Sequence, residues 1–336
     1  MSGSSQPGGD RHAEVEAERR RLDLRLEQRL GFTQARLRLG IERDHHHEVF
    51  TRSGHFFHLE NWYSVHALIR ACVRMVGLHG RGQRNSTRLE LRHNRLVLPA
   101  LPALFDGFRI LHLSDLHVDM ESLHLHALVE RIREVDYDIC VMTGDYRRKT
   151  FGDFAATLKG LESVRLHLQE PVYAVLGNHD TVRMVPAMED MGIALLLNES
   201  LPIKRENQVI YLAGIDDAHF FRADNVEKSM DLIPPEAVKI LLSHTPEVYR
   251  QAAHAGYDAF LCGHTHGGQI CLPGGFPLTL DARCPRHMGR GPWRYQSMQG
   301  YTSAGAGTSI VDLRFNCPPE ITLHTLERPS ADTQSK

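Results

Sequence analysis

Short apolar runs alternate with stretches of helical periodicity from about residue 105 onward. A short apolar run bounded by polar or turn residues is typical of a buried strand, and a 3.6-residue apolar period is typical of a helix. Strands are predicted at residues 109–113, 139–142, 172–176, 209–214, 239–242 and 259–262, with later ones at 309–313 and 321–326, and helices near 123–134 and 154–168. This alternation favours a layered α/β architecture with its functional side chains at the carboxyl ends of strands.

The amino-terminal part of the chain has a different pattern. Residues 1–9 are rich in Ser, Gly and Pro and are predicted to be disordered. From about residue 12 to 43, Arg, Glu, Leu and Ala are densely mixed, which predicts one charged helix or a helical pair broken near Gly31 or Gly40. The histidine run at 44–48 is either a polar loop or a metal-binding tract, and no partner ligand spacing supports the second interpretation.

Between residues 62 and 76, apolar residues recur at helical spacing, with Arg70 and Arg74 off that stripe. Such an amphipathic basic helix either packs against the catalytic domain or docks on a membrane surface. Residues 89–97 predict a hairpin around Asn94. The predicted organisation is a charged, helical or partly disordered extension at 1–60, the helix and a strand or hairpin at 61–104, a catalytic domain at 105–327 and a disordered tail at 328–336.

Composition narrows the class of protein. The chain has 336 residues and a formal net charge of -2, which argues against a nucleic-acid partner. Its six cysteines form no C-x-x-C pair, which favours a reducing, cytoplasmic compartment. The run of arginines at 19–21 is followed by charged residues, and residues 62–78 are interrupted by His66, Arg70 and Arg74. We therefore expect neither an export signal nor a transmembrane helix.

Carboxylate, carboxamide and imidazole side chains follow the predicted strands directly. They are Asp115, His117, Asp145, Asn178, His179, His244, His264 and His266. Oxygen and nitrogen donors without a thiolate suit two divalent metals that share a ligand, and two such metals suit attack on a phosphate. In an extended backbone, residues two apart face the same way, so Asp115 and His117 are expected to reach one ion, and His264 and His266 repeat this spacing.

The ordered set D-x-H, G-D, G-N-H-D, H and G-H-x-H resembles the calcineurin-like metallophosphoesterase superfamily over residues 105–327. The stretches GHTHGGQ at 263–269, AGAGTS at 304–309 and RFNCPPEIT at 314–322 are similar to a bacterial branch that includes predicted membrane-associated phosphodiesterases. The resemblance implies a layered α/β/β/α sandwich, here preceded by a helical amino-terminal extension, and a metal-dependent phosphoric ester hydrolase.

The resemblance also implies roles for single residues. Asp115, His117 and His266 would hold one metal, and Asn178, His244 and His264 the other, with Asp145 bridging the two. His179 would be the catalytic residue that acts on the leaving group or the phosphate. His112 and His219 are interpreted as structural strand-end histidines.

One position departs from the pattern: Arg148 occupies the place of an aspartate that usually orients the catalytic histidine. Asp180 or Asp217 is a candidate replacement, and Arg147 or Arg148 is a candidate phosphate clamp.

The predicted function is hydrolysis of a phosphodiester or pyrophosphate by attack of a metal-bridging hydroxide. Mn, Fe, Zn and Co all suit the ligands, with Mn favoured. A phospholipid or nucleotide-linked lipid is the first substrate class. Arginines and aromatic residues between 269 and 301, including Trp293, support it. The alternatives are a soluble nucleotide phosphodiesterase or phosphatase and a non-catalytic binding module. The protein is expected to touch the anionic inner membrane surface reversibly, through residues 62–78 and the loop near Trp293.

Overall fold

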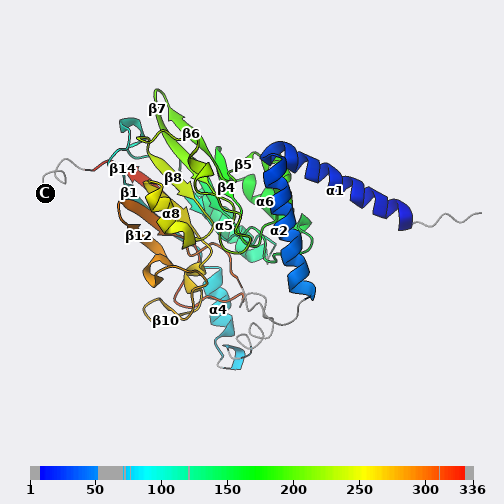
Figure 1. The fold of residues 1–336 in the computed structure, drawn as a ribbon. Helices are drawn as coiled ribbons and strands as arrows, with labels where there is room; N and C mark the ends of the chain where they lie inside the picture. Colours follow the sequence, from blue (N-terminus) through cyan, green and yellow to red (C-terminus); the bar gives the residue numbers. More distant parts are fainter. Residues whose placement is uncertain are drawn as a thin grey trace, which may run out of the picture.

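The computed structural model describes residues 8–51, 71, 73–75, 77–119, 122–309 and 311–329, and two six-stranded sheets form its centre (Figure 1). In the first sheet β2 to β5 run parallel, and β14 joins β2 antiparallel and β1 parallel. In order, its strands are β1 (Glu90–Val97), β14 (Glu320–Glu327), β2 (Arg109–Leu113), β3 (Ile139–Thr143), β4 (Val172–Val175) and β5 (Ile193–Leu195).

The second sheet has a parallel centre and two antiparallel edges. Its order is β12 (Gly291–Tyr295), β13 (Met298–Thr302), β9 (Ala259–Cys262), β8 (Lys239–Leu242), β7 (Gln208–Gly214) and β6 (Glu199–Arg205). A separate hairpin pairs β10 (Cys271–Leu272) with β11 (Phe276–Pro277). Single 3-10 turns occur at η2 (Ala103–Phe105), η3 (Val182–Met184), η4 (Lys228–Met230), η5 (Pro246–Val248), η6 (His266–Gly268) and η7 (Arg286–Met288).

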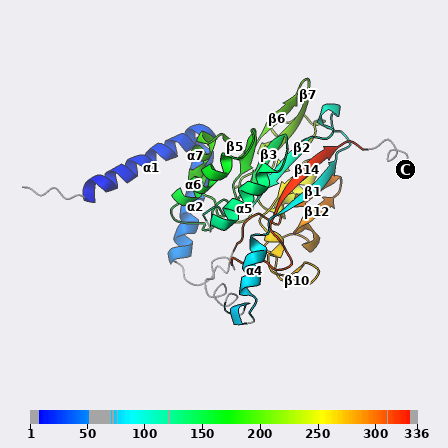
Figure 2. The ribbon, with the colours of Figure 1, turned by 180° about the vertical axis from the view of Figure 1, so that it is seen from behind.

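Three hydrophobic clusters separate the layers. Side chains from both sheets, such as Ile110 and Ile240, form the central cluster. The outer face of the first sheet is covered by α5 (Ser122–Arg133), α6 (Ala155–Arg165) and α7 (Val185–Asp190), and that of the second by α8 (Tyr249–His254) (Figure 2). Strands buried on both faces read as continuous apolar runs, which explains why the sequence located them. The predicted α/β/β/α sandwich is confirmed.

The amino-terminal extension consists of two helices, α1 (Gly8–Leu30) and α2 (Phe32–Thr51). The chain turns at Gly31, whose φ of +83° suits glycine, so the break lies there and not at Gly40. Leu26, Ala35 and Leu39 bury their side chains in the cluster on the helical side of the first sheet. The start of α1 projects away from the body, whereas α2 lies along it (Figure 1). A further helix, α4 (His79–Ser86), precedes β1.

Three predicted elements were wrong, and one cannot be compared. The tract at 44–48 is no loop, because it continues the helix α2. Residues 89–97 form no hairpin: β1 is one strand parallel to β14, because Asn94 pairs with His324 inside the sheet instead of forming a turn. No strand occurs at 309 and 311–313, where the Gln269 side chain bonds the backbone of Ser309 and Val311. The predicted helix at 62–76 lies largely outside the described residues. Among the described helices, none is long and apolar enough to span a membrane.

Candidate metal centre

Two groups of buried ligand-type side chains meet where the strands of both sheets end. Asp115, His117 and His266 form one group, and Asp145, His244 and His264 form the other. Within each group, one potential ligand atom of every residue lies within 4.8 Å of the others. Loops after β2, β3, β8 and β9 supply these six side chains. The topology of the two sheets therefore brings together residues that are up to 151 positions apart.

Short contacts between the polar atoms tie the site together. His117 Nε2 lies 3.3 Å from His266 Nε2, and His266 Nε2 lies 3.4 Å from Asp115 Oδ1. In the other group, His244 Nε2 lies 3.3 Å from Asp145 Oδ2 and 3.2 Å from His264 Nδ1.

Asn178, which follows β4, joins the second group through its Oδ1 atom, 2.9 Å from His244 Nε2. The structure thus brings together all seven residues that the sequence assigned to metals.

The backbone reaches this geometry in a way that the sequence analysis did not anticipate. Five of the seven residues have positive φ: Asp115 (52°), His117 (43°), Asp145 (56°), His264 (71°) and His266 (49°). The expected extended backbone was wrong, although Asp115 and His117 do lie in one group as predicted. Left-handed conformations are uncommon for residues with a side chain and cluster at functional sites. His264 and His266 divide between the two groups, as the family resemblance implied.

Glycines allow the loops to approach each other. A Cβ atom on Gly263 would lie 1.8 Å from Ser114 Oγ and 2.4 Å from Asp115 Oδ2. One on Gly177 would lie 2.2 Å from Asp145 Oδ1. Contacts of that length are impossible, so both positions need glycine for the carboxylates to keep their place.

Backbone carbonyls fix the tautomers of two histidines. His117 Nδ1 lies 2.6 Å from the carbonyl oxygen of Arg147, and His244 Nδ1 lies 2.7 Å from that of Thr143. A carbonyl only accepts, so each Nδ1 carries the proton and each Nε2 directs its lone pair into the site when the ring is neutral. Lone pairs that face carboxylate, amide and imidazole acceptors repel unless a positive charge lies between them. The donor set therefore fits divalent cations.

The pKa values of the site residues also indicate that the site favours added positive charge. Burial would lower the pKa of His244, but the Asp145 carboxylate outweighs it and raises this pKa to about 10. Burial would raise the pKa of Asp145, yet His244, His179 and His117 hold it well below its usual range. Burial lowers the pKa values of His264 and His266 well below the usual range, so these rings are neutral and ready to coordinate.

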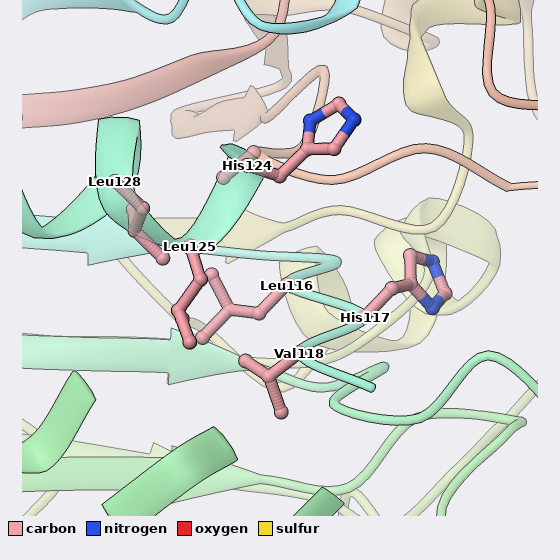
Figure 3. A pocket seen from close by; sticks show the side chains of 7 residues that line it. Leu116, His117, Val118, His124, Leu125 and Leu128 are labelled. Carbon is pink, nitrogen blue, oxygen red and sulfur yellow. The ribbon is translucent and has the colours of Figure 1, made fainter. Parts of the chain in front are cut away.

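Leu116, the neighbour of His117, anchors the loop that carries them by packing against α5. Figure 3 shows the two side chains pointing in different directions, with Leu116 toward Leu125 of α5. The cavity that Leu116 and Leu125 help to line has a volume of about 10 Å³, which is enough for roughly one water molecule and too small for a substrate.

His179 lies beside the metal groups and not within either of them. Its Nε2 is 3.9 Å from Asp145 Oδ2, its backbone N–H donates to Asp145 Oδ1, and its Nδ1 lies 2.9 Å from Thr150 Oγ1. Thr150 therefore orients the ring, a role that the sequence analysis assigned to Asp180 or Asp217. Thr150 comes five residues after Asp145 in an irregular loop, and no local signal in the sequence marked it.

The carboxylates of Asp180 and Asp217 instead accept hydrogen bonds from backbone N–H groups. The Asp180 carboxylate accepts hydrogen bonds from the backbone N–H groups of Asp145, Tyr146 and Gly177. Burial, assisted by the Asp145 charge, raises the pKa of Asp180 to about 6. Asp217 accepts from the N–H groups of residues 219–221.

Neither Arg147 nor Arg148, the two candidates for a phosphate clamp, directs its guanidinium toward the metal groups. The buried Arg147 guanidinium donates to the carbonyl oxygens of Thr150 and Gly152, so it supports the Thr150 loop. The Arg148 guanidinium lies 3.7 Å from Asp312.

Of the two histidines that were interpreted as structural, His112 fits that interpretation. Its Nδ1 lies 3.2 Å from His324 Nε2 and its Nε2 lies 2.8 Å from Thr143 Oγ1. His219 lies closer to the chemistry than expected, with its ring centroid 4.2 Å from that of His264. It also pairs with Glu247, and with His264 and Asp281 it forms a third possible ligand group. A cation there would require His264 to coordinate through both nitrogens, so we regard His219 as a neighbour that supports His264.

Comparison with known proteins agrees with this geometry. Residues 108–271 match the calcineurin-like phosphoesterase superfamily domain. An uncharacterized metallophosphoesterase of Bacillus subtilis, YkoQ, is 31% identical over an alignment of 227 residues, which covers 65% of this chain and 83% of that protein. The chain belongs to the calcineurin-like metallophosphoesterase superfamily.

Two further relatives of this metallophosphoesterase carry more specific names. The phosphodiesterase YaeI of Escherichia coli is 29% identical and is aligned over 64% of this chain and 81% of its own. A transmembrane protein with metallophosphoesterase domain from Danio rerio is 29% identical over 66% of this chain and 54% of its own. The present chain is thus a metal-dependent phosphoric ester hydrolase with two buried His/Asp triads that are consistent with a binuclear metal site.

Proposed function

We propose that this metallophosphoesterase hydrolyses a phosphodiester or pyrophosphate bond with two metal ions per chain. Asp115, His117 and His266 would hold one ion, and Asn178, His244 and His264 the other. Asp145 contacts His244 of the second group and His179, and it would be the ligand that both ions share. The strongest support is that each group buries several acceptor atoms against one another. Such atoms repel unless positive charge lies between them. Two such ions supply Lewis acidity and a nucleophile at neutral pH.

His179 is proposed to act on the leaving group. Thr150 fixes its Nδ1 atom, so Nε2 faces the edge of the metal centre near Asp145. A histidine held in this way can deliver a proton to the departing oxygen, which is general acid catalysis worth about 10²–10⁴-fold in rate. The fixed ring also reduces the reorganisation needed in each turnover.

We further propose an amphiphilic substrate at an anionic membrane surface. The hairpin β10–β11 exposes Leu272, Phe276 and Leu278, each about half accessible to solvent. It packs directly on the metal-ligand loop, because a Cβ on Gly268 would lie 2.4 Å from Pro277 Cβ.

A basic side chain accompanies this apolar hairpin. The Arg286 guanidinium lies over the Phe276 ring, 5.1 Å from its centroid. Exposed apolar groups with a nearby arginine suit an interface of acyl chains and anionic head groups.

Trp293 itself does not face solvent, although it belongs to the loop region that was predicted to contact the membrane. Trp293 lies on β12, is buried against Phe260, and donates from Nε1 to Thr302 Oγ1. Side chains alternate between the two faces of a strand, and Trp293 lies on the face of the edge strand β12 that points into the core. The sequence did not reveal this. The proposed membrane contact therefore rests on the β10–β11 hairpin among the described residues. It is consistent with a cytoplasmic protein at the inner membrane face.

A substrate panel tests the reaction and its substrate class. Phosphomonoesters, nucleotide phosphodiesters, phospholipids and nucleotide-linked lipid pyrophosphates should be assayed with added Mn²⁺, the lipids in mixed micelles. We expect diesters or pyrophosphates to exceed monoesters and the rate to rise with the surface concentration of lipid. A rate that is independent of micelles, with nucleotides preferred, would favour the soluble nucleotide phosphodiesterase instead.

Vesicle sedimentation tests the surface. The full chain should sediment with phosphatidylglycerol vesicles at low salt and less at high salt, because screening weakens contact between arginines and anionic lipid. Replacing Leu272, Phe276 and Leu278 together by serine should abolish sedimentation. The matched control replaces Leu166 and Leu232, which are exposed elsewhere, by serine and should not. Equal sedimentation of both variants would refute the role of the hairpin.

A further inference from the structure

The amino-terminal helix α2 inserts two charged side chains next to the loop that carries Asn178 and His179. Arg38 is 1% exposed and Glu42 is 8% exposed, and the two form an ion pair one helical turn apart, 2.8 Å between Nη1 and Oε1. Neither residue lies in the part of the chain that matches the superfamily domain, residues 108–271. An extension outside that domain therefore reaches into its interior.

Glu42 binds the segment directly after the proposed catalytic histidine. Its Oε2 accepts a hydrogen bond from Thr181 Oγ1 (2.6 Å), and its Oε1 accepts one from the backbone N–H of Val182 (2.7 Å). These two contacts hold η3, the turn that immediately follows His179-Asp180-Thr181. Charge-assisted hydrogen bonds of this length are stronger than neutral ones.

Arg38 links the same segment to a loop of the second sheet. Its Nε donates to Asp216 Oδ2 (3.0 Å), and its Nη2 donates to the carbonyl oxygen of Asp180 (3.4 Å). The guanidinium also lies on the Phe221 ring, 3.8 Å from the centroid. Arg38 thus joins residue 180, after β4, to residues 216 and 221, after β7.

Asp180 connects the segment held by Arg38 to the metal centre. Its carboxylate binds the backbone N–H groups of Gly177 and Asp145, both at 2.8 Å, while its carbonyl oxygen accepts from Arg38. Asn178 and His179 lie between Gly177 and Asp180. The loop with one proposed metal ligand and the proposed acid is therefore held at one end by Asp180 itself and just beyond that end by Glu42.

Anchoring α2 to the body would not by itself need buried charge. Ala35 and Leu39 of the same helix already bury apolar side chains in the core. A buried ion pair is often no more stabilising than well-packed apolar residues of the same volume, because both charges lose their hydration. What the charged atoms provide is directed contact with Asp180, Thr181 and Val182.

We propose that Arg38 and Glu42 are positioning residues for the catalytic loop, and that α2 is a working part of the active site. They act through residues 180–182 on Asn178 and His179 and touch neither substrate nor metal. The inference rests on the proposed function, since it assigns those two residues to metal binding and leaving-group chemistry.

The test compares Arg38→Met and the milder Glu42→Gln with the control Arg29→Met in the full chain. Arg29 belongs to α1 and pairs with Glu189 and Glu199, neither of which belongs to residues 177–182. Removing a residue that orients the groups at a metal site costs about 10–100-fold in activity or metal affinity. We expect that loss in kcat for both test variants, little change in KM, and kcat within twofold of wild type for Arg29→Met.

A double-mutant cycle separates positioning from general stability. Because Arg38 is proposed to act partly through His179, Arg38→Met should cost less activity in a His179→Ala background than in the wild type, so the two effects are not additive. Independent, additive losses, or a kcat within twofold of wild type in both Arg38→Met and Glu42→Gln, would overturn the proposal.

Hydrogen exchange distinguishes this proposal from the proposed reaction. In the metal-free protein, Arg38→Met should accelerate amide exchange at residues 177–182, and Arg29→Met should not. A wild-type protein without metal-dependent phosphoesterase activity would refute the proposed function, while the exchange rates would still decide whether α2 holds the loop. Unchanged exchange at 177–182 would refute the positioning role even in an active enzyme.

Discussion

Two clusters of buried histidines lie close together in this protein and differ in their surroundings. His112 on β2 and His324 on β14 contact each other, with ring centroids 5.4 Å apart. Their other ring nitrogens contact Thr143 and Asn94, which are neutral. Burial lowers the pKa of His112 to about 3, so this cluster is uncharged and needs no ligand.

The histidines of the metal centre begin only five residues further along the same segment, at His117. There the neighbours are carboxylates: Asp115 beside His266 and Asp145 beside His244. Burial and the nearby Asp145 raise the pKa of Asp115, while the pKa of His244 rises because of Asp145. Burial of a histidine therefore does not by itself indicate a function. Buried histidines that share space with carboxylates offer the ligands of a cation, and that difference separates a site from a core.

Replacing Asp145 by Asn should have the largest effect. It removes the charge proposed to bind both ions, so bound Mn²⁺ measured by elemental analysis and metal-dependent hydrolysis should both fall to background. His112→Gln is the matched control from the neutral cluster and should keep two ions and a kcat within about twofold of wild type. Two ions and full activity in Asp145→Asn would contradict the comparison between the clusters.

His179→Ala should rank next. General acid help is worth about 10²–10⁴-fold, so turnover should fall by that factor with an alkyl leaving group, while both ions remain bound. With a nitrophenyl leaving group, which barely needs a proton, the loss should be much smaller. A loss of equal size for both leaving groups would indicate that His179 binds the phosphate instead.

The metal affinity should depend on pH. The pKa of His244 is raised to about 10 in the metal-free protein, so a proton must leave before a metal binds there. Below that pKa, affinity should rise by up to about tenfold per pH unit, and Mn²⁺ binding should release a proton. Calorimetric titration between pH 6 and 8, in buffers of different ionisation enthalpy, measures both. A pH-independent affinity without proton release would contradict the assignment of His244.

The neutral cluster should affect stability and not metal binding. The pKa of His112 is lowered to about 3 in the folded state, whereas an unfolded histidine titrates near 6.5. Its contribution is complete above about pH 6.5 and is lost as pH falls toward 3, because only the unfolded chain takes up the proton. From pH 6.5 to 5, wild type should lose about 2 kcal/mol more than His112→Gln in urea unfolding. Parallel losses would place the acid sensitivity elsewhere.

The candidate metal-ligand residues could be picked out from the sequence because their signal is local. Each follows a short apolar strand, often beside a glycine, as in Gly144-Asp145 and Gly263-His264. The fold followed for the same reason, since strands buried on both faces are continuous apolar runs. The left-handed backbone at Asp115 and His264 was not predicted, because few non-glycine residues adopt that conformation, even though Asp and His are enriched in it.

What escaped prediction depends on contacts between distant residues. Parallel pairing of β1 with β14 places Asn94 opposite His324, 230 positions away. Thr150 reaches His179 from an irregular loop. Arg38 was visible only as one charge among many in a helical stretch, although it contacts Asp216 across 178 positions. A sequence read in windows gives no information on such contacts.

Metal titration of the wild-type protein tests the dimetal assignment most directly. The chelator-treated protein should be titrated with Mn²⁺ while bound metal and hydrolysis of bis(p-nitrophenyl) phosphate are followed together. We predict that binding saturates at two ions per chain and that activity reaches its maximum only when the second ion binds. Saturation at one ion, or full activity in the presence of chelator, would contradict a binuclear centre built on Asp145.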